Sequence, residues 1–422
     1  MGAPPSGATV SFTTRPKTLR APLRAPLSAA ITVLALTLMS ANGLGAQNGS
    51  APAGWSSFTR LLESYADSDR IVGTSALVMR DGRILARHNY GFANKAAGKR
   101  VDDRSIFHWG SITKTLTAIA IMQLRDRGRL SLDDKVTRWV PELRAIHDPY
   151  GMIDSITIRM LLSHSAGFQN GTWPYGNGAA WEPFEPTTWD QLVAMMPYQQ
   201  LHFKPGSKYS YSNPAFIYLA RIVERISGDT WQSYVQKNLL SPLGLDRSYF
   251  GATPYYLAAD RSHNYYVRRD SVTRHDSVID NGADFDPGIT IPNGGWNAPL
   301  DDLATYLAFL TSAPGGRLPR DRYGVVLKRA SLEEMWQPVV TTDAGYGSEA
   351  DFMGLSFFGT RRDGVTYLGH TGSQAGFRAF MYFDPAKRTA VVVAFNTTMR
   401  GSTPGARAAQ QAVTNAASGL LK

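Results

Sequence analysis

The fold is decided by Ser111-Ile112-Thr113-Lys114, which opens a run with apolar residues at helical spacing as far as Arg127. This run predicts a buried helix that ends at Gly128. Positions i and i+3 share one face of a helix, so the Lys114 amine can reach the Ser111 hydroxyl. Burial and the positive end of the helix lower the pKa of such an amine, which can then accept the serine proton. The alternative is a capping serine with a lysine whose amine reaches the surface.

A second polar element is Tyr211-Ser212-Asn213, which precedes a predicted helix over 215–226. A phenol beside a serine–lysine pair can relay protons to a leaving group. The Asn213 amide can orient the lysine and bind a substrate carbonyl. Tyr209 is a rival for the tyrosine role, but only Tyr211 has an asparagine two residues later. The alternative is an aromatic loop residue followed by a helix cap.

A third element is His370-Thr371-Gly372-Ser373, which follows a strand-like segment over 365–368. A strand edge with a small residue and a glycine lets a substrate backbone lie alongside. The backbone N–H groups of Ser373 and Ser111 would then form an oxyanion hole. The alternative for an isolated His-Thr-Gly is a hairpin turn.

Together and in this order, the three elements resemble the superfamily of serine β-lactamases, penicillin-binding proteins, D-Ala-D-Ala carboxypeptidases and family VIII esterases. The resemblance covers about residues 55–420 and includes three further segments, namely 161–167, 204–206 and 293–295. It implies a covalent mechanism in which Ser111 is the nucleophile, while Lys114 and Tyr211 transfer protons. Asn213, His370, Thr371 and Gly372 would bind substrate, and His164 would pack at a helix end. The resemblance implies no metal and no cofactor.

One position departs from the usual pattern of the β-lactamases, which carry Lys-Thr-Gly where this chain has His370. A neutral imidazole holds a substrate carboxylate less firmly than an ammonium group. The resemblance is therefore to D-stereospecific peptidases and low-affinity penicillin-binding proteins, and the substrates expected are peptides with D-residues or related amides. Arg378 can supply the missing cation, or it can be a solvent-facing strand residue. The alternatives are a carboxylesterase, a β-lactamase, or a penicillin-binding protein that does not turn over.

Strand signals cluster at both ends of the chain and helical signals in its middle. Asp81-Gly82 and Asp384-Pro385 each separate two apolar runs, which is typical of hairpins. Helices are expected over 57–66, 158–162, 189–196, 215–226, 297–310 and 406–417, with Asn297 capping the fifth. An α+β fold follows: an antiparallel sheet from about 55–110 and 290–422, flanked by helices, and a mainly helical insertion over 111–289. The active site would lie in the cleft between them.

The first 46 residues predict a secretory signal peptide: four basic residues precede an apolar run over 27–39 and small residues up to Ala46. A linker over 47–54 would follow, and the protein would be secreted or periplasmic. The alternative is an uncleaved membrane anchor. Without the four basic residues the net charge falls from +10 to +6, which favours weak attraction to an anionic cell envelope. The chain has no cysteine, no metal-ligand spacing and no basic–aromatic pattern typical of nucleic-acid binding.

A loop rich in aromatic residues lies between Phe168 and Pro186. Its side chains predict either a lid over the substrate or a small local core. They are Trp173, Tyr175, Trp181 and Phe184, with Trp189 just beyond.

Overall fold

The computed structural model describes residues 50–168, 186–270, 272–273, 275–313, 320–342, 350–362, 364–399 and 404–422. The predicted signal peptide and the loop aromatics Trp173, Tyr175, Trp181 and Phe184 lie outside these residues. The fold is that of the unit 46–422. Within the described ranges, no helix is both long and apolar enough to cross a bilayer.

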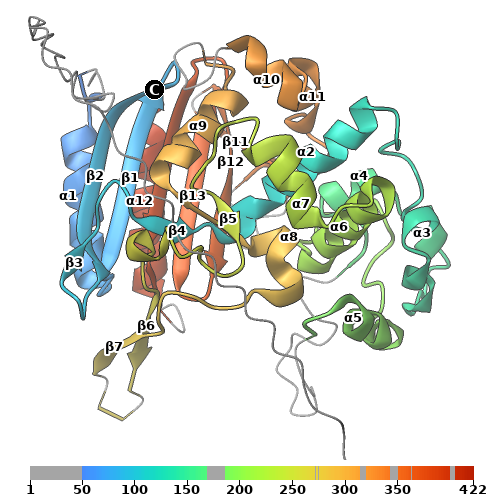
Figure 1. Ribbon diagram of the computed structural model, residues 1–422, viewed down its shortest axis with the longest axis horizontal. Coiled ribbons are helices and arrows are strands. Elements are labelled where there is room, and N and C mark those ends of the chain that lie inside the picture. The colour runs from blue at the N-terminus through green and yellow to red at the C-terminus, as the bar shows by residue number, and fades with distance from the viewer. Residues whose placement is uncertain are drawn as a thin grey trace, which may run out of the picture. The chain divides into compact units, whose positions relative to one another are not determined.

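The main sheet has nine antiparallel strands and joins the two ends of the chain. Figure 1 shows the blue strands of the N-terminal part beside the red strands of the C-terminal part. At the junction Thr74 lies opposite Phe395, and Arg80 lies opposite Thr389. The strands in spatial order are β3 (Lys99–Arg100), β2 (Arg83–Asn94), β1 (Gly73–Arg80), β14 (Thr389–Phe395), β13 (Phe377–Asp384), β12 (Val365–Gln374), β11 (Phe358–Arg362), β10 (Phe352–Met353) and β9 (Val340–Thr341). The prediction of one antiparallel sheet built from both ends is confirmed.

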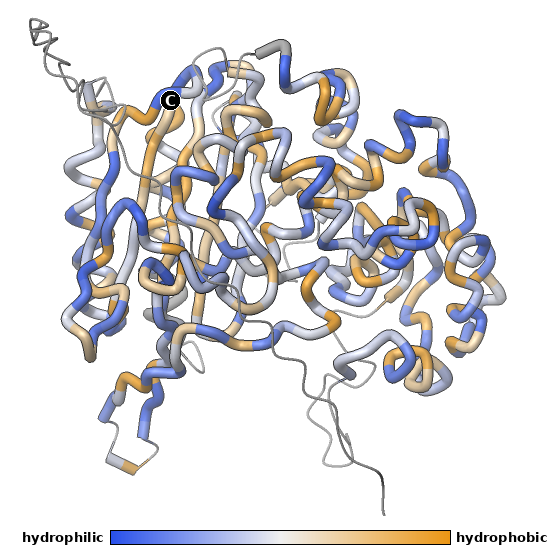
Figure 2. The backbone as a smooth tube through the Cα atoms, viewed as in Figure 1, coloured by the Kyte–Doolittle hydropathy of each residue, from blue (hydrophilic) through white to orange (hydrophobic). Residues whose placement is uncertain are grey.

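Each face of the sheet is covered by helices because the strands alternate apolar residues toward both sides. On one face, here called the outer face, α1 (Trp55–Ser68) and α12 (Pro404–Gly419) share a core with the sheet. The opposite, inner face contributes to a larger core that contains α2 (Thr113–Asp126) and α9 (Leu300–Leu310). Apolar colouring accordingly runs along the central strands in Figure 2.

The helices of the middle segment are grouped to one side of the sheet (Figure 1). Helix α2 is buried at every position from Thr113 to Leu124. Helix α6 (Asn213–Ser227) begins where the Ser212 hydroxyl accepts a hydrogen bond from the Ala215 N–H, and it ends at Gly228 with a φ of 78°. The other helices are α3 (Val136–Trp139), α4 (Ile158–Leu162), α5 (Trp189–Met195), α7 (Trp231–Val235), α8 (Ile291–Gly294), α10 (Arg320–Val326) and α11 (Arg329–Met335).

Two small sheets accompany the main one, so the middle segment also contains strands. One holds β15 (Thr397–Met399), β6 (Tyr265–Arg269) and β7 (Asp276–Asp280), and the other holds β4 (Ile106–His108), β8 (Trp296–Pro299) and β5 (Tyr249–Phe250). The β6–β7 hairpin projects from the rest and is mostly hydrophilic in Figure 2.

The predicted capping role of Asn297 is wrong. Helix α9 begins at Leu300, after Pro299, and Asn297 lies in strand β8 opposite His108 of β4. The Asn297 Oδ1 is 2.9 Å from the His108 Nδ1. Asn297 thus pairs with the buried His108 imidazole in the strand. Local spacing in the sequence does not reveal this contact.

Candidate active site

Ser111 lies in a 3₁₀ turn, Gly110–Ile112, between β4 and α2. The Thr113 hydroxyl fixes this turn because it donates to the Gly110 carbonyl at 2.6 Å and accepts from the Trp296 N–H at 3.0 Å. Gly110 has a φ of 50°, and a Cβ atom there would lie 2.7 Å from the Ser373 nitrogen. The turn is therefore held tightly against β12, with Ser111 at the wall of a cavity.

Lys114 is completely buried behind Ser111. Its Nζ lies 3.0 Å from the Ser111 Oγ, 2.7 Å from the Asn213 Oδ1 and 2.8 Å from the Asn293 carbonyl oxygen. Burial lowers the pKa of Lys114 well below its usual value. A neutral amine has two N–H groups and one lone pair. The two amide oxygens can only accept, so they engage both N–H groups, and the lone pair is left facing the Ser111 hydroxyl.

Tyr211 contacts the same Ser111 hydroxyl. Burial raises the pKa of Tyr211, while a hydrogen bond with the Ser111 side chain acts in the opposite direction. Its ring centroid lies 4.9 Å from the Lys114 Nζ. Tyr209, the rival in the sequence, packs edge-on against Phe358 and His164. Tyr211 is thus the phenol that the structure brings to Ser111, and it stays protonated at neutral pH.

His164 holds Tyr211 in place, a role that the sequence did not reveal. The Ser210 N–H donates to the His164 carbonyl at 2.8 Å, and the Ser212 N–H donates to its Nδ1 at 3.0 Å. Both neighbours of Tyr211 are therefore tied to His164. The imidazole also stacks on the Tyr211 ring, with 4.3 Å between centroids. The one available signal was the position of this histidine within the segment 161–167.

The segment His370–Ser373 belongs to strand β12, so the hairpin-turn alternative is wrong. Strand β11 pairs with β12 only as far as Gly369, which leaves the edge beyond it without this neighbour. A Cβ atom at Gly372 would lie 1.9 Å from the Trp109 oxygen and 3.2 Å from the Ser111 nitrogen. This close approach brings the backbone nitrogens of Ser111 and Ser373 to one side of the cavity.

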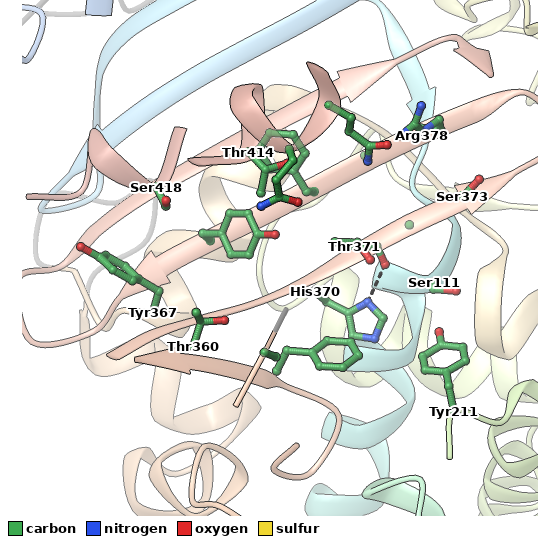
Figure 3. Close-up of a pocket in the computed structure, with 18 of the residues that line it drawn as sticks. Ser111, Tyr211, Thr360, Tyr367, His370, Thr371, Ser373, Arg378, Thr414 and Ser418 are labelled. Atoms are coloured by element: carbon green, nitrogen blue, oxygen red, sulfur yellow. Dashed lines mark hydrogen bonds between the residues drawn. The ribbon is translucent and has the colours of Figure 1, made fainter. Parts of the chain in front are cut away.

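His370 is buried, with an exposed fraction of 1%, and it lies at the end of the cavity that holds Ser111 and Tyr211 (Figure 3). Its Nδ1 lies 2.5 Å from the Thr371 carbonyl oxygen and therefore carries the proton. Burial is the main cause that lowers the pKa of His370 to about 3. The side chain is consequently neutral at physiological pH and contributes no cation to substrate binding.

Arg378 lies on β13 opposite Ser373, and it lines the cavity from the outer face. Its Nη1 donates to the Tyr65 hydroxyl at 3.2 Å. The guanidinium is thus anchored to helix α1 while it forms part of the cavity wall. It is therefore not a purely solvent-facing residue, and its role as the substitute cation stays a prediction.

The cavity has a volume of about 550 Å³ and gathers eight of the nine predicted site residues. Those that line it are Ser111, Tyr211, Asn213, His370, Thr371, Gly372, Ser373 and Arg378. Lys114 lies directly behind the wall. Among the described residues, no group of three or more His, Asp or Glu side chains is arranged to hold a metal ion.

Gly372→Ala is expected to reduce kcat/KM by about 100-fold or more, because a displacement of about 1 Å at a catalytic backbone has effects of this size. The new methyl group would overlap the Trp109 oxygen, so β12 must move away from Ser111. Steady-state kinetics with an aryl ester measures the change. Gly324→Ala in α10 is the control, since its Cβ would meet nothing within 4 Å. Equal activity of both variants would show that this close approach is dispensable.

Three buried histidines predict that the protein loses stability in acid. Burial is the main cause that lowers the pKa of His108 to about 4, that of His370 to about 3, and that of His164 well below its usual value. Below about pH 6.5 these three imidazoles bind protons in the unfolded chain but not in the folded chain. The free energy of unfolding is therefore highest above that pH and falls as the pH decreases toward 4.

The expected slope is at most about 4 kcal/mol per pH unit for three such groups. Urea unfolding between pH 7.5 and pH 4.5 measures it. His108→Gln should make the slope shallower by about one proton. A free energy of unfolding that stays constant over this range would contradict the prediction.

Comparison with known proteins gives a consistent set of relatives. A family model described as Beta-lactamase matches residues 58–416. Penicillin-binding protein 4* of Bacillus subtilis is 29% identical over 191 residues, which are 44% of this chain and 40% of that protein. Esterase EstB of Burkholderia gladioli is 34% identical over 196 residues, which are 44% of this chain and 49% of that protein. The matches thus span less than half the length of these two relatives.

A solved structure shares the fold. The D-stereospecific amidohydrolase from Streptomyces sp. superposes with a TM-score of 0.65 and 25% sequence identity. The match covers 86% of this chain and 98% of that one.

Proposed function

The chain belongs to the β-lactamase family, and on this premise we propose that it is a serine hydrolase that forms a covalent acyl-enzyme on amide or ester carbonyls. The observation that carries the proposal is the hydrogen bonding of Lys114. Its buried amine has two carbonyl-type acceptors, Asn213 Oδ1 and Asn293 O, which leaves the lone pair for the Ser111 hydroxyl. This arrangement activates a serine as a nucleophile.

In the first step the Ser111 proton moves to Lys114 while Oγ bonds to the substrate carbonyl carbon. The negative charge that develops on the carbonyl oxygen is stabilised by the N–H groups of Ser111 and Ser373. Tyr211 donates its proton to the leaving atom as the carbon–leaving-group bond breaks, and Lys114 returns the proton to Tyr211. Water then attacks the acyl-enzyme, and the acid and free Ser111 are released.

The leading substrate class is peptides with D-residues or related amides. The neutral His370 supports it, because the site offers no ammonium group at the position where β-lactamases hold a carboxylate. The similarity to a D-stereospecific amidohydrolase over most of the chain supports it as well. A carboxylesterase is the second candidate, which is favoured by the 34% identity to esterase EstB over 196 residues.

Turnover of three substrates tests the proposal: a D-Ala-D-Ala peptide, a short-chain aryl ester and a chromogenic cephalosporin. We expect hydrolysis of the first two and little hydrolysis of the cephalosporin. Intact mass after exposure to penicillin separates turnover from trapping, because a persistent adduct would indicate a binding protein and a transient adduct an enzyme. Efficient cephalosporin hydrolysis would overturn the assigned substrate class, and no hydrolysis with no adduct would overturn the enzyme itself.

The proposal includes export to the periplasm or the medium, with a weak attraction of the basic mature chain to anionic surfaces. The order of basic, apolar and small residues before Gln47 supports it. N-terminal sequencing of protein recovered from the cell envelope tests it, and the expected first residue is Gln47. Retention of the intact leader would favour the membrane-anchor alternative.

A further inference from the structure

The cavity continues beyond the catalytic end and crosses to the outer face of the sheet. Its floor there is made by side chains of β11, β12, β13 and β14, which are Thr360, Tyr367, Phe380, Tyr382 and Phe395. Helix α12 provides a wall with Gln410, Gln411, Thr414 and Ser418. These nine residues are here called the outer groove. Figure 3 shows Ser111 and Tyr211 at one end of the cavity and Tyr367 and Ser418 toward the other.

The two faces of β12 separate the groove from the catalytic lysine. Thr371 lies opposite Phe380, and Ser373 lies opposite Arg378, so these side chains point to the outer face. His370 and Gly372 alternate with them and point to the inner face. The cavity can pass from one face to the other because β11 stops pairing at Gly369. The groove is therefore continuous with the site and distinct from it.

The length of the groove suits an extended chain. From Ser373 to Tyr367 the strand runs six residues, which corresponds to about 20 Å. A cavity of about 550 Å³ has the size of small-molecule sites in general. A linear arm that starts at the reacting carbonyl can thus lie along the floor as far as Tyr367.

The chemistry of the groove suits an apolar arm with a polar end. Four of the floor side chains are aromatic rings that form the outer-face core or pack against it, namely Tyr367, Phe380, Tyr382 and Phe395. The groove also meets guanidinium groups at both ends, Arg378 beside Ser373 and Arg362 on β11, and no Asp or Glu lines the described cavity. Rings favour an apolar chain, and guanidiniums favour an acceptor oxygen or a carboxylate at its far end.

We propose that the outer groove binds the acyl arm of the substrate, and that this arm is a long apolar chain. The inference rests on the proposed function. The leaving atom must face Tyr211, which gives it a proton. The other substituent of the carbonyl carbon therefore points away from Tyr211, toward β12 and the groove. Substrates with long acyl groups are thus preferred over acetyl substrates.

A series of p-nitrophenyl esters with acyl chains of two, four, eight and twelve carbons tests this inference. We expect kcat/KM to rise by about 10³-fold or more from the acetate to the octanoate, because six methylenes are added and each buried methylene contributes about a fourfold gain. Thr414→Trp should fill the groove, remove most of this gain and leave acetate hydrolysis within about twofold of wild type. Ser418→Phe, nearer the far end, should affect the dodecanoate alone. Ala412→Trp is the matched control, since this residue of α12 is exposed.

The outcomes separate the two proposals. Acetate hydrolysis that depends on Ser111 but shows no preference for longer chains would overturn the groove and leave the hydrolase intact. Equal loss of acetate and octanoate hydrolysis in folded Thr414→Trp would also overturn it. If wild type hydrolyses no ester, amide or peptide, the proposed function itself fails. Melting temperatures show whether the three variants are folded. If Thr414→Trp does not fold, the dodecanoate activity of Ser418→Phe is the test of the groove.

Discussion

Ser111→Ala is expected to abolish turnover of every substrate, with a fall in kcat on the order of 10⁴ or more, because residues that act as one catalytic unit lose nearly the whole rate when the nucleophile is removed. Alanine retains the backbone N–H and the turn that Thr113 fixes. The loss would therefore report on the hydroxyl alone. The variant should unfold at a temperature close to that of wild type.

The measurement is steady-state kinetics on the peptide and the aryl ester, together with intact mass after exposure to penicillin. Wild type should gain an adduct and Ser111→Ala should gain none. Ser207→Ala is the control, because this serine lies exposed outside the cavity. If Ser111→Ala keeps wild-type activity, the nucleophile lies elsewhere and the proposed mechanism is wrong.

Lys114→Met should lower kcat/KM by a factor of about 10³, which is the size expected for the loss of a general base. Methionine fills a similar volume and has no lone pair that accepts the serine proton. Two oxygens, Asn213 Oδ1 and Asn293 O, lose a donor, but the buried amine disappears as well. We therefore expect a small change in melting temperature.

Lys114→Arg separates the two roles that a lysine can play here. A guanidinium keeps its positive charge and cannot accept a proton at any ordinary pH. A loss similar to that of Lys114→Met, measured as the rate of acylation by penicillin, would identify Lys114 as a base. Activity near that of wild type in Lys114→Arg would instead show that a positive charge is what the site requires.

The local parts of this site could be predicted from the sequence because they depend on helix geometry. The spacing between Ser111 and Lys114 predicted a contact, and the two side chains lie 3.0 Å apart. The pairing of strands from both ends followed from the hairpin signals and is confirmed. The nearby Asn213 favours Tyr211 over Tyr209 as the functional tyrosine, and Tyr211 is the one that contacts Ser111 in the structure.

The remaining parts depend on contacts between distant segments. His164 reaches Tyr211 through two backbone neighbours that lie more than 40 residues later in the chain, as the separation of 48 between His164 and Ser212 shows. Local spacing predicts a helix cap at Asn297, but the residue lies in a strand, where its side chain contacts His108. The outer groove arises because β11 stops pairing at Gly369, and no local pattern marks that residue.

The pairing of β1 with β14 has a consequence for the order of events during synthesis. β1 is made early and its partner is made near the end, so the middle of the sheet cannot close until Phe395 has left the ribosome. Such distant pairings fold slowly. The same holds for the Ser111 turn, since the Gly372 backbone that braces it is absent from any chain that ends before residue 372. A product that terminates before this strand therefore has no assembled site, and hydrolytic capacity arises late in synthesis.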